Sequence, residues 1–434
     1  MTDLGWGLLG MALMFVLMIF RMPVGMSMLC VGFFGTGFMS GERSAMALLV
    51  TEAYSAVSNY SLIVIPMFLL MGNVASAAGF SRGLYEAAFS WVGGFRGGLA
   101  SASVIGCAAF SAVSGSSVAT AVTIGRAALP EMKRFNYADR LATGAVAAGG
   151  TLGFLIPPST GFVIYAILTE ESIGQLFMAG VLPGLLLTAL FIVTVVIITT
   201  LDPAAGPKNT GIRWSSRFAA LLGALPLVVV IIVSIGGIYF GAFTPVEASG
   251  VGAVLVIAFA LASRRLSWAL LYRAGEDTIK TTAMLFVIVI GASVLNPFLS
   301  LTHLPGALEQ LLRASELGPY GILLLIVLLY LVLGMFMDGL AMLVVTVPIF
   351  FPVVTGLGFD PIWFGVVCVI AVEMGMITPP VGLNVFVVKG IAKDVPMAEI
   401  FRGVMPFWGA MVTCLLIIIA FPRIALYLPQ TMFR

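Results

Sequence analysis

Charge is scarce in this sequence. Asp, Glu, Lys and Arg together make up only 9% of its 434 residues, whereas 61% are hydrophobic and the mean hydropathy is +1.14. So few charged side chains cannot cover the surface of a water-soluble protein of this size, so the composition indicates a polytopic membrane protein embedded in a lipid bilayer. The formal net charge is only +2, and we expect no nucleic-acid partner.

Residues that commonly carry enzyme chemistry are also few. The chain has one histidine, His303, and four cysteines that stand alone in apolar sequence: Cys30, Cys107, Cys368 and Cys414. The sequence contains no HExxH, GxSxG or CxxC motif, so nothing indicates a hydrolase, a metal site or a disulfide. We therefore predict that the protein is not an enzyme and that it uses no cofactor.

Long apolar runs dominate instead. A membrane-spanning helix needs roughly 20 mostly apolar residues. Clear candidates are Leu4–Phe20, Met22–Met39, Ser61–Ala78, Leu182–Thr200, Phe218–Phe240, Val246–Ser263, Thr281–Ser300 and Gly403–Phe421. The longest polar connection, residues 201–217, has the size and composition of a linker. The N-terminus lacks a basic region and a small-residue cleavage site, so we expect a first helix there and not a removable signal.

Two of the apolar stretches are interrupted in the same way. Thr151–Ser159 reads TLGFLIPPS and Glu373–Val381 reads EMGMITPPV, so a glycine and a pair of prolines recur 222 residues apart. The same offset relates Pro23 to Pro245, Ser27 to Ser249, Ser116 to Asp338, and Pro130 to Pro352. We therefore predict an internal duplication, with halves 1–200 and 218–434 joined by a cytoplasmic linker at 201–217.

The distribution of Lys and Arg predicts the topology. If segments at about 97–132 and 319–353 enter the membrane and return as re-entrant hairpins, 17 of the 21 basic residues fall on one side and 4 on the other. The basic side should be cytoplasmic, which places both termini in the periplasm of a bacterial inner membrane. Each half then crosses an odd number of times, so the halves should be inverted. We predict an all-α fold of about ten transmembrane helices plus two re-entrant hairpins, with broken helices at about 138–168 and 360–391.

Inverted repeats with broken helices are typical of secondary transporters, whose sites lie near the midplane where the repeats meet. The first hairpin turn (SAVSGSSVAT, Ser111–Thr120) is rich in hydroxyls, and the N–H groups of its returning helix attract carboxylates. Each proline pair leaves upstream carbonyls without donors, and such oxygens suit Na⁺. The alternative is that the prolines only kink helices for packing, which does not explain a polar turn in each half. Candidate substrate contacts are Ser116, Ser117, Ser159, Thr160, Asp338 and Asn384.

Two carboxylates have two possible roles each. Asp338 lies at the second hairpin turn, where it can cap the returning helix or contact a ligand or ion. Glu373 lies one turn before the second break, and an ionisable side chain at that depth is usually functional. The first half has Thr151 at that position, so Glu373 is not common to both predicted cation sites. Proton coupling and a salt bridge are the two possibilities.

The combination GSS, PEMKRFNYADRLATG and GTLGFLIPPS, followed by DG and GMITPPVGLN, resembles the large membrane (M-type) subunit of tripartite ATP-independent periplasmic (TRAP) transporters. The resemblance covers essentially the whole chain. It implies an elevator-type secondary transporter driven by a Na⁺ gradient. It also implies two partners, a small four-helix membrane subunit (Q-type) and a periplasmic substrate-binding protein (P-type), with an organic acid as substrate. This chain has no room for the small subunit, so it is similar to the unfused members.

The resemblance also implies two sodium sites made of backbone and hydroxyl oxygens. The first would use Ser111, Ser114, Gly153, Ile156 and Pro157. The second would use Gly334, Met337, Gly375, Thr378 and Val381. Met337 can contribute only through its main chain, because its side chain has no oxygen.

In an elevator, segments 97–168 and 319–391 should move as a transport domain while the remaining spans form a scaffold. The amphipathic stretches Phe80–Phe95 and Leu304–Leu317 should be the connecting arms, or simple interfacial anchors. Other functions remain possible from the sequence: a stand-alone sodium-coupled carboxylate symporter, a membrane-embedded enzyme, or a channel. The sequence does not indicate which organic acid is carried.

Overall fold

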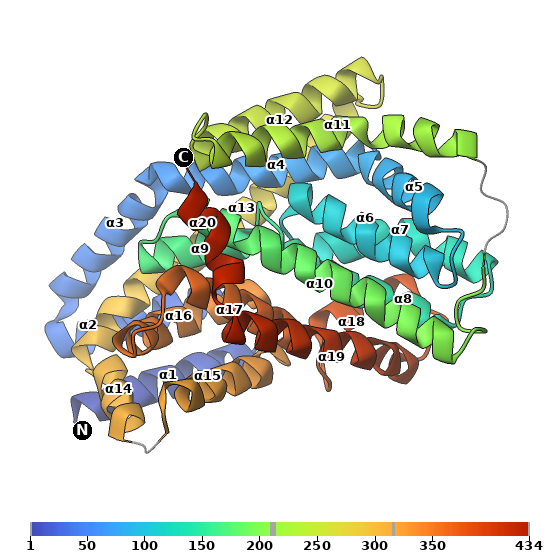
Figure 1. Ribbon diagram of the computed structural model, residues 1–434. Helices are drawn as coiled ribbons and strands as arrows, with labels where there is room; N and C mark the ends of the chain where they lie inside the picture. Colours follow the sequence, from blue (N-terminus) through green and yellow to red (C-terminus); the bar gives the residue numbers. More distant parts are fainter. Residues whose placement is uncertain (1, 209–213, 315–316, 433–434) are drawn as a thin grey trace.

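The computed structural model describes residues 2–208, 214–314 and 317–432 (Figure 1). These residues form twenty α-helices and one short 3₁₀ helix, and no strand occurs among them. Part of the predicted linker, 209–213, and two residues of the predicted second arm, 315 and 316, lie outside the described residues.

The helices follow one another with short connections. The first half contains α1 (Asp3–Ile19), α2 (Val24–Ser40), α3 (Glu42–Ser58), η1 (Tyr60–Ile63), α4 (Val64–Ala77), α5 (Phe80–Val92), α6 (Gly98–Ser114), α7 (Ser117–Arg134), α8 (Asp139–Leu155), α9 (Thr160–Thr169) and α10 (Ile173–Leu201). The second half contains α11 (Trp214–Tyr239), α12 (Pro245–Ala262), α13 (Trp268–Leu301), α14 (Leu304–Ala314), α15 (Pro319–Gly334), α16 (Gly339–Gly356), α17 (Pro361–Gly375), α18 (Leu383–Ile391), α19 (Met397–Ala420) and α20 (Arg423–Thr431).

Eight helical stretches of the described chain are long and apolar enough to cross a membrane. The prediction of an all-α polytopic membrane protein is therefore confirmed. Each span predicted from hydropathy falls on a helix, although α10, α13 and α19 begin well before the predicted start. The sequence analysis predicted no element at α3 or α20. The charges of α3 lower its hydropathy, and α20 is short, so neither resembles a spanning run.

The helices recur at the offset found in the sequence. α7 and α16 begin 222 residues apart and also end 222 residues apart. In the same order α5 and α6 correspond to α14 and α15, and the interrupted pair α8 and α9 corresponds to α17 and α18. One correspondence differs in form, because α3, η1 and α4 together match the single 34-residue helix α13.

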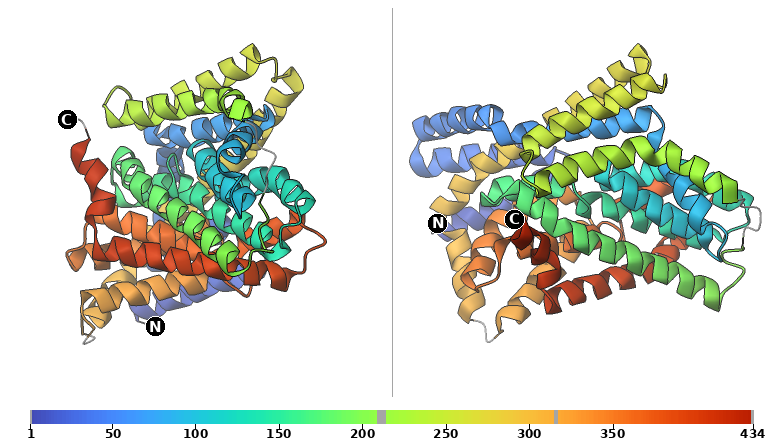
Figure 2. Two further views of the ribbon diagram at one scale, coloured as in Figure 1. Left: turned by 45° about the vertical axis from the view of Figure 1, so that its right-hand side comes forward. Right: turned by 45° about the horizontal axis from the view of Figure 1, so that its top comes forward.

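Two groups of helices pack among themselves. The outer bundle, defined as α2, α4, α11, α12 and α13, is held by contacts of α13 with α2 and α4 and of α12 with α4 and α11. Both views of Figure 2 place α11 and α12 together along the outside of the molecule. The hairpin bundle contains α6 to α9 and α15 to α18, and its broken helices α8 and α17 are buried along almost their whole length.

Helices α10 and α19 also belong to the hairpin bundle. Both pack against α8 and α17, and α10 has few contacts with the outer bundle. Glycines allow this approach, since a Cβ built on Gly144 of α8 would lie 2.3 Å from the carbonyl oxygen of Gly403 of α19. Counting all spans outside the hairpins and broken helices as scaffold does not match this packing. The sequence pattern cannot show which partner a glycine faces.

The predicted arms contact both bundles. Helix α5 packs against α11 of the outer bundle and α6 of the hairpin bundle, and α14 packs against α13 and α16. Both helices are strongly amphipathic, as expected of helices that lie along an interface. They are therefore placed to join the two bundles.

Candidate transport site

The first hairpin turn lies against the first helix break. Only Gly115 and Ser116 separate α6 from α7. The carbonyl of Gly115 accepts hydrogen bonds from the backbone N–H and the Oγ1 of Thr160, at 3.2 and 2.9 Å. Gly115 has φ +61°, and a Cβ there would lie 2.6 Å from the carbonyl oxygen of Pro158. Only glycine fits this turn, both for its backbone and for its close neighbour.

The contact brings several oxygens together at Gly153. The proline pair after it removes the helical donors for the carbonyls of Gly153 and Phe154. Oγ of Ser159 donates to the Phe154 carbonyl at 2.5 Å, whereas no hydrogen bond among the described residues reaches the Gly153 carbonyl. A Cβ built on Gly153 would lie 2.4 Å from the carbonyl oxygen of Ser116 and 2.8 Å from Oγ1 of Thr120. Carbonyl and hydroxyl oxygens thus converge here, as a hard cation requires.

The other residues predicted for the first sodium site are nearby in the same helices and are largely buried. Ser111 donates to the carbonyl of Cys107 at 2.6 Å, and the hydroxyls of Ser114 and Thr120 are hydrogen-bonded at 2.7 Å. A hydroxyl that donates to a carbonyl keeps its lone pairs for a cation. Ile156 and the following proline can contribute main-chain oxygens, because they end α8 directly after Gly153. Thr120 was not predicted, although it lies four residues after the hairpin turn on the same helix.

The second hairpin meets the second break through two glycines. A Cβ on Gly334 would lie 2.8 Å from the Cα of Gly375, and a Cβ on Gly375 would lie 2.7 Å from the Cα of Gly334. The carbonyls of Gly375 and Met376, whose helical donors are replaced by prolines, accept N–H bonds from Thr378 and Asn384 at 3.0 and 3.1 Å. The second break is therefore more completely hydrogen-bonded than the first.

The side chain of Thr378 is held in place from outside the break. Its Oγ1 donates to the carbonyl of Met374 at 2.6 Å and accepts a bond of 3.0 Å from the indole N–H of Trp408 in α19. Met337 is 9% exposed and Val381 is partly buried, and both offer only main-chain oxygens to this region. The sequence analysis missed Trp408, because no motif links it to the break.

Ser116 and Asp338 are equivalent N-caps of the two returning helices. Oγ of Ser116 accepts a bond of 3.4 Å from the backbone N–H of Ala119. Oδ1 of Asp338 accepts bonds of 3.0 and 3.1 Å from the backbone N–H groups of Leu340 and Ala341. The capping role considered for Asp338 is present, and it uses one of the two carboxylate oxygens.

Three other substrate candidates make structural hydrogen bonds. Ser159 and Thr160 bond to the backbone at the first break and turn, while Ser117 donates to Oε1 of Glu373 at 2.5 Å. Glu373 therefore has a serine partner from the other half instead of a basic partner. Asn384 differs from these three, because its side chain is fully buried and neither amide atom forms a hydrogen bond within the described chain.

The two hairpin regions differ in exposure. Pro157 and Pro158 are buried, whereas Pro379 and Pro380 are exposed. At the second hairpin turn Phe336 is 67% exposed. In this conformation the second half of the site is the more accessible one.

An ion pair closes one end of the hairpin bundle. Lys133 near the end of α7 pairs with Asp394 in the loop after α18. This ammonium group, as a hydrogen-bond donor and a nearby positive charge, holds the pKa of Asp394 below its ordinary value. Both side chains are exposed, so the pair contributes little to stability.

Two helical hairpins that each face a broken helix, in two sequence halves at a constant offset, are typical of membrane secondary transporters. Comparison with solved structures supports this class. The YdaH transporter of Alcanivorax borkumensis is 15% identical and superposes with a TM-score of 0.63 over 90% of this chain and 88% of that chain. At this identity the similarity indicates a shared fold.

The sequence comparisons define the family. The profile described as "Tripartite ATP-independent periplasmic transporter, DctM component" matches residues 11–424, and the chain belongs to this family. A C4-dicarboxylate TRAP transporter large permease protein of Pseudomonas aeruginosa is 37% identical, over 88% of this chain and 89% of its own length. An ectoine TRAP transporter large permease protein of Halomonas elongata is 31% identical, over 98% and 99%. These relatives are transport permeases, so the chain is a permease and not an enzyme.

Proposed function

We propose that this chain is the permease subunit of a TRAP transporter that uses a Na⁺ gradient to import an organic carboxylate. The carboxylate would be delivered by a periplasmic binding protein, and a small membrane subunit would complete the permease. Family membership supports the tripartite organisation over a stand-alone symporter. The relatives carry names for different substrates, C4-dicarboxylates and ectoine, so the family alone does not select one compound for this chain.

The observation that carries the sodium proposal is the carbonyl of Gly153. It is buried, has no hydrogen bond within the described chain, and approaches the Ser116 carbonyl and the Thr120 hydroxyl. A buried carbonyl without a donor is costly, and a desolvated Na⁺ would remove that cost by binding to it. The second site, around Gly334, Met337, Gly375, Thr378 and Val381, would bind Na⁺ in the same way after its backbone bonds rearrange.

Substrate would bind between the two hairpin turns. The cap residues Ser116 and Asp338, together with the unpartnered amide of Asn384, are the candidates that this conformation leaves best able to contact it. The packing also supports an elevator, because the arms α5 and α14 join a hairpin bundle to an outer bundle. On this proposal the protein lies in the bacterial inner membrane with both termini in the periplasm.

Reconstitution tests the proposal. The cognate binding protein is first screened by thermal shift against a panel of organic acids, and the acid that stabilises it is used as radiolabelled substrate. Proteoliposomes that hold the chain with its small subunit should take up this acid only with an inward Na⁺ gradient, in the presence of the binding protein. Equal uptake in potassium or choline buffer would exclude sodium coupling. Full uptake without the binding protein would instead favour the stand-alone symporter.

A further inference from the structure

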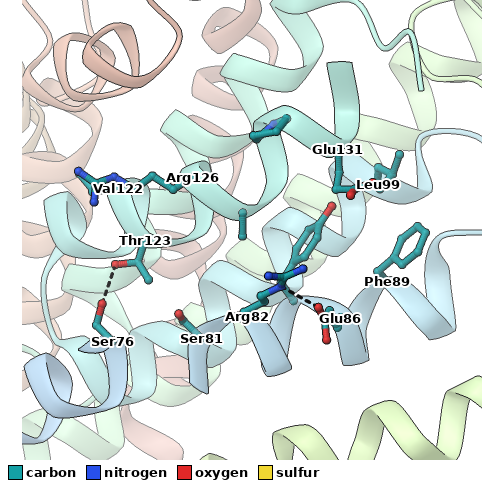
Figure 3. A pocket seen from close by; sticks show the side chains of 13 residues that line it. Ser76, Ser81, Arg82, Glu86, Phe89, Leu99, Val122, Thr123, Arg126 and Glu131 are labelled. Atoms are coloured by element: carbon teal, nitrogen blue, oxygen red, sulfur yellow. Dashed lines mark hydrogen bonds and ion pairs between the residues drawn. The ribbon is translucent and has the colours of Figure 1, made fainter. Parts of the chain in front are cut away.

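A polar cavity of about 710 Å³ lies between the first arm and the first hairpin (Figure 3). Small-molecule sites usually measure about 300–1,000 Å³, so this volume is sufficient for a ligand. The cavity is formed by the end of α4, by α5, and by the returning hairpin helix α7. Its charged and hydroxyl-bearing residues are Ser76, Ser81, Arg82, Tyr85, Glu86, Thr123, Arg126 and Glu131.

The charges that line the cavity do not cancel. Arg82 forms an ion pair of 2.8 Å with Glu86, and Glu131 forms one of 4.0 Å with Arg134. Arg126 is exposed and has no acidic partner among the described residues. The cavity therefore contains one uncompensated cation, and the guanidinium group is well shaped to bind a carboxylate through two hydrogen bonds.

Hydroxyl groups surround this cation. Thr123 is three residues before Arg126 on α7, and its Oγ1 lies 3.4 Å from Oγ of Ser76 (Figure 3). Tyr85 also lines the cavity. Its side chain is 4% exposed, and its hydroxyl forms no hydrogen bond within the described chain. A buried hydroxyl without a partner beside an unpaired arginine indicates that a hydrogen-bonding anion belongs between them.

The cavity is connected to the candidate transport site through α7. Ser116 caps this helix, and Arg126 lies ten residues further, about 15 Å along the axis at 1.5 Å per residue. The second half has no such feature, because the residue equivalent to Arg126 is Pro348. The cation is thus present on only one of the two hairpins.

We propose that this cavity is a release-side binding site for the transported carboxylate, in which Arg126 binds the carboxylate group and Thr123 and Tyr85 donate hydrogen bonds. The direction rests on the proposed function, which makes the basic end of α7 cytoplasmic. Because the site exists on one side only, it favours departure of the anion from the hairpin turn toward the cytoplasm. The phosphate of an anionic lipid has similar chemistry, and the experiment separates these two sources.

The test uses a reporter cysteine that does not require transport. Thr123→Cys is made in a Cys30→Ser background and reacted with an anionic and a cationic methanethiosulfonate of similar size. An uncompensated arginine nearby should accelerate the anionic reagent, and adding Arg126→Gln should reduce the anionic-to-cationic rate ratio by about tenfold. Lys133→Gln, which removes a cation from the same helix but outside the cavity, should leave the ratio unchanged. An unchanged ratio in Arg126→Gln would overturn the proposal.

Ligand protection identifies the anion. Succinate, a C4-dicarboxylate, should slow the modification of Thr123→Cys in neutral phosphatidylcholine liposomes, and Arg126→Gln should abolish this protection while Arg126→Lys keeps part of it. Protection that appears only when phosphatidylglycerol replaces succinate would show a lipid site and overturn the carboxylate assignment. Failure of the proposed function would look different: the wild-type complex would show no Na⁺-driven uptake, while the charge-dependent rate ratio and the protection by succinate persist.

Discussion

The hydroxyl of Ser117 donates a hydrogen bond of 2.5 Å to Oε1 of Glu373, and this bond joins the two halves of the chain. Ser117 begins α7 in the first hairpin, and Glu373 lies in α17, the broken helix of the second half. Glu373 is 1% exposed, and its Oε2 has no partner in the described parts of the chain. Because a buried carboxyl group needs hydrogen bonds, this single contact should help to hold the halves together.

Removing the partner of Glu373 should destabilise the protein. Ser117→Ala leaves the buried carboxyl without a donor, which costs about 1–3 kcal/mol. The melting temperature in detergent, followed with a thiol-reactive dye on the buried cysteines, measures the loss. Ser103→Ala is the matched control, because buried Ser103 bonds only to the Leu99 carbonyl of its own helix. Equal shifts in the two variants would show that the bond between the halves has no special weight.

Adding one methyl group at the first break should weaken sodium coupling. Gly153→Ala places a Cβ against the Ser116 carbonyl, 2.4 Å away before relaxation, so the oxygens must separate. We expect the Na⁺ concentration for half-maximal uptake to rise about tenfold, which corresponds to about 1.4 kcal/mol. Gly409→Ala has no atom within 4 Å of its new Cβ and should behave as wild type. A normal Na⁺ dependence in Gly153→Ala would remove this position from the cation site.

The two roles of Asp338 can be separated with the residue used in the other half. Asp338→Ala removes the N-cap and should lower stability by about 1 kcal/mol. Asp338→Ser copies Ser116 and should restore the cap and the melting temperature, yet it lacks the charge and should still reduce uptake. If Asp338→Ser transports as well as wild type, capping is the whole function of this residue.

The inverted arrangement of the halves can be tested at equivalent positions. Arg134 and Gly356 are the last residues of α7 and α16, and both are exposed. With Cys30 replaced by serine, Arg134→Cys should react with an impermeant maleimide only from the cytoplasmic side, and Gly356→Cys only from the periplasmic side. Labelling of both cysteines from one side would contradict the inverted repeat.

Local sequence features predicted the elements better than their contacts. Hydropathy and proline pairs act on the segment that contains them, so the spans at α11 and α12 and the breaks after α8 and α17 could be located. The bonds between Ser117 and Glu373 and between Thr378 and Trp408 connect separate helices, and no spacing rule predicts them. The same holds for α10 and α19, whose place in the hairpin bundle depends on glycine contacts such as that of Gly144 with Gly403.

The last prediction concerns movement of the hairpin bundle. Ser76 of α4 in the outer bundle and Thr123 of α7 in the hairpin bundle place their hydroxyl oxygens 3.4 Å apart, so a cysteine pair there should form a disulfide. If the bundles move as rigid bodies, this cross-link must stop transport, because α4 and α7 can no longer slide past each other. Adding a reductant should restore uptake.

The control cross-link lies entirely within the hairpin bundle. A Cβ on Gly125 of α7 would lie 3.0 Å from Cγ1 of Val146 in α8, so Gly125→Cys with Val146→Cys should also form a disulfide. Both helices belong to the moving body in an elevator, so this cross-linked protein should keep transporting. Binding-protein docking, measured by co-purification, should survive in both. Full uptake by the cross-linked Ser76→Cys and Thr123→Cys protein would exclude rigid-body movement and favour local gating around a fixed site, because the bundles would then be joined throughout the cycle.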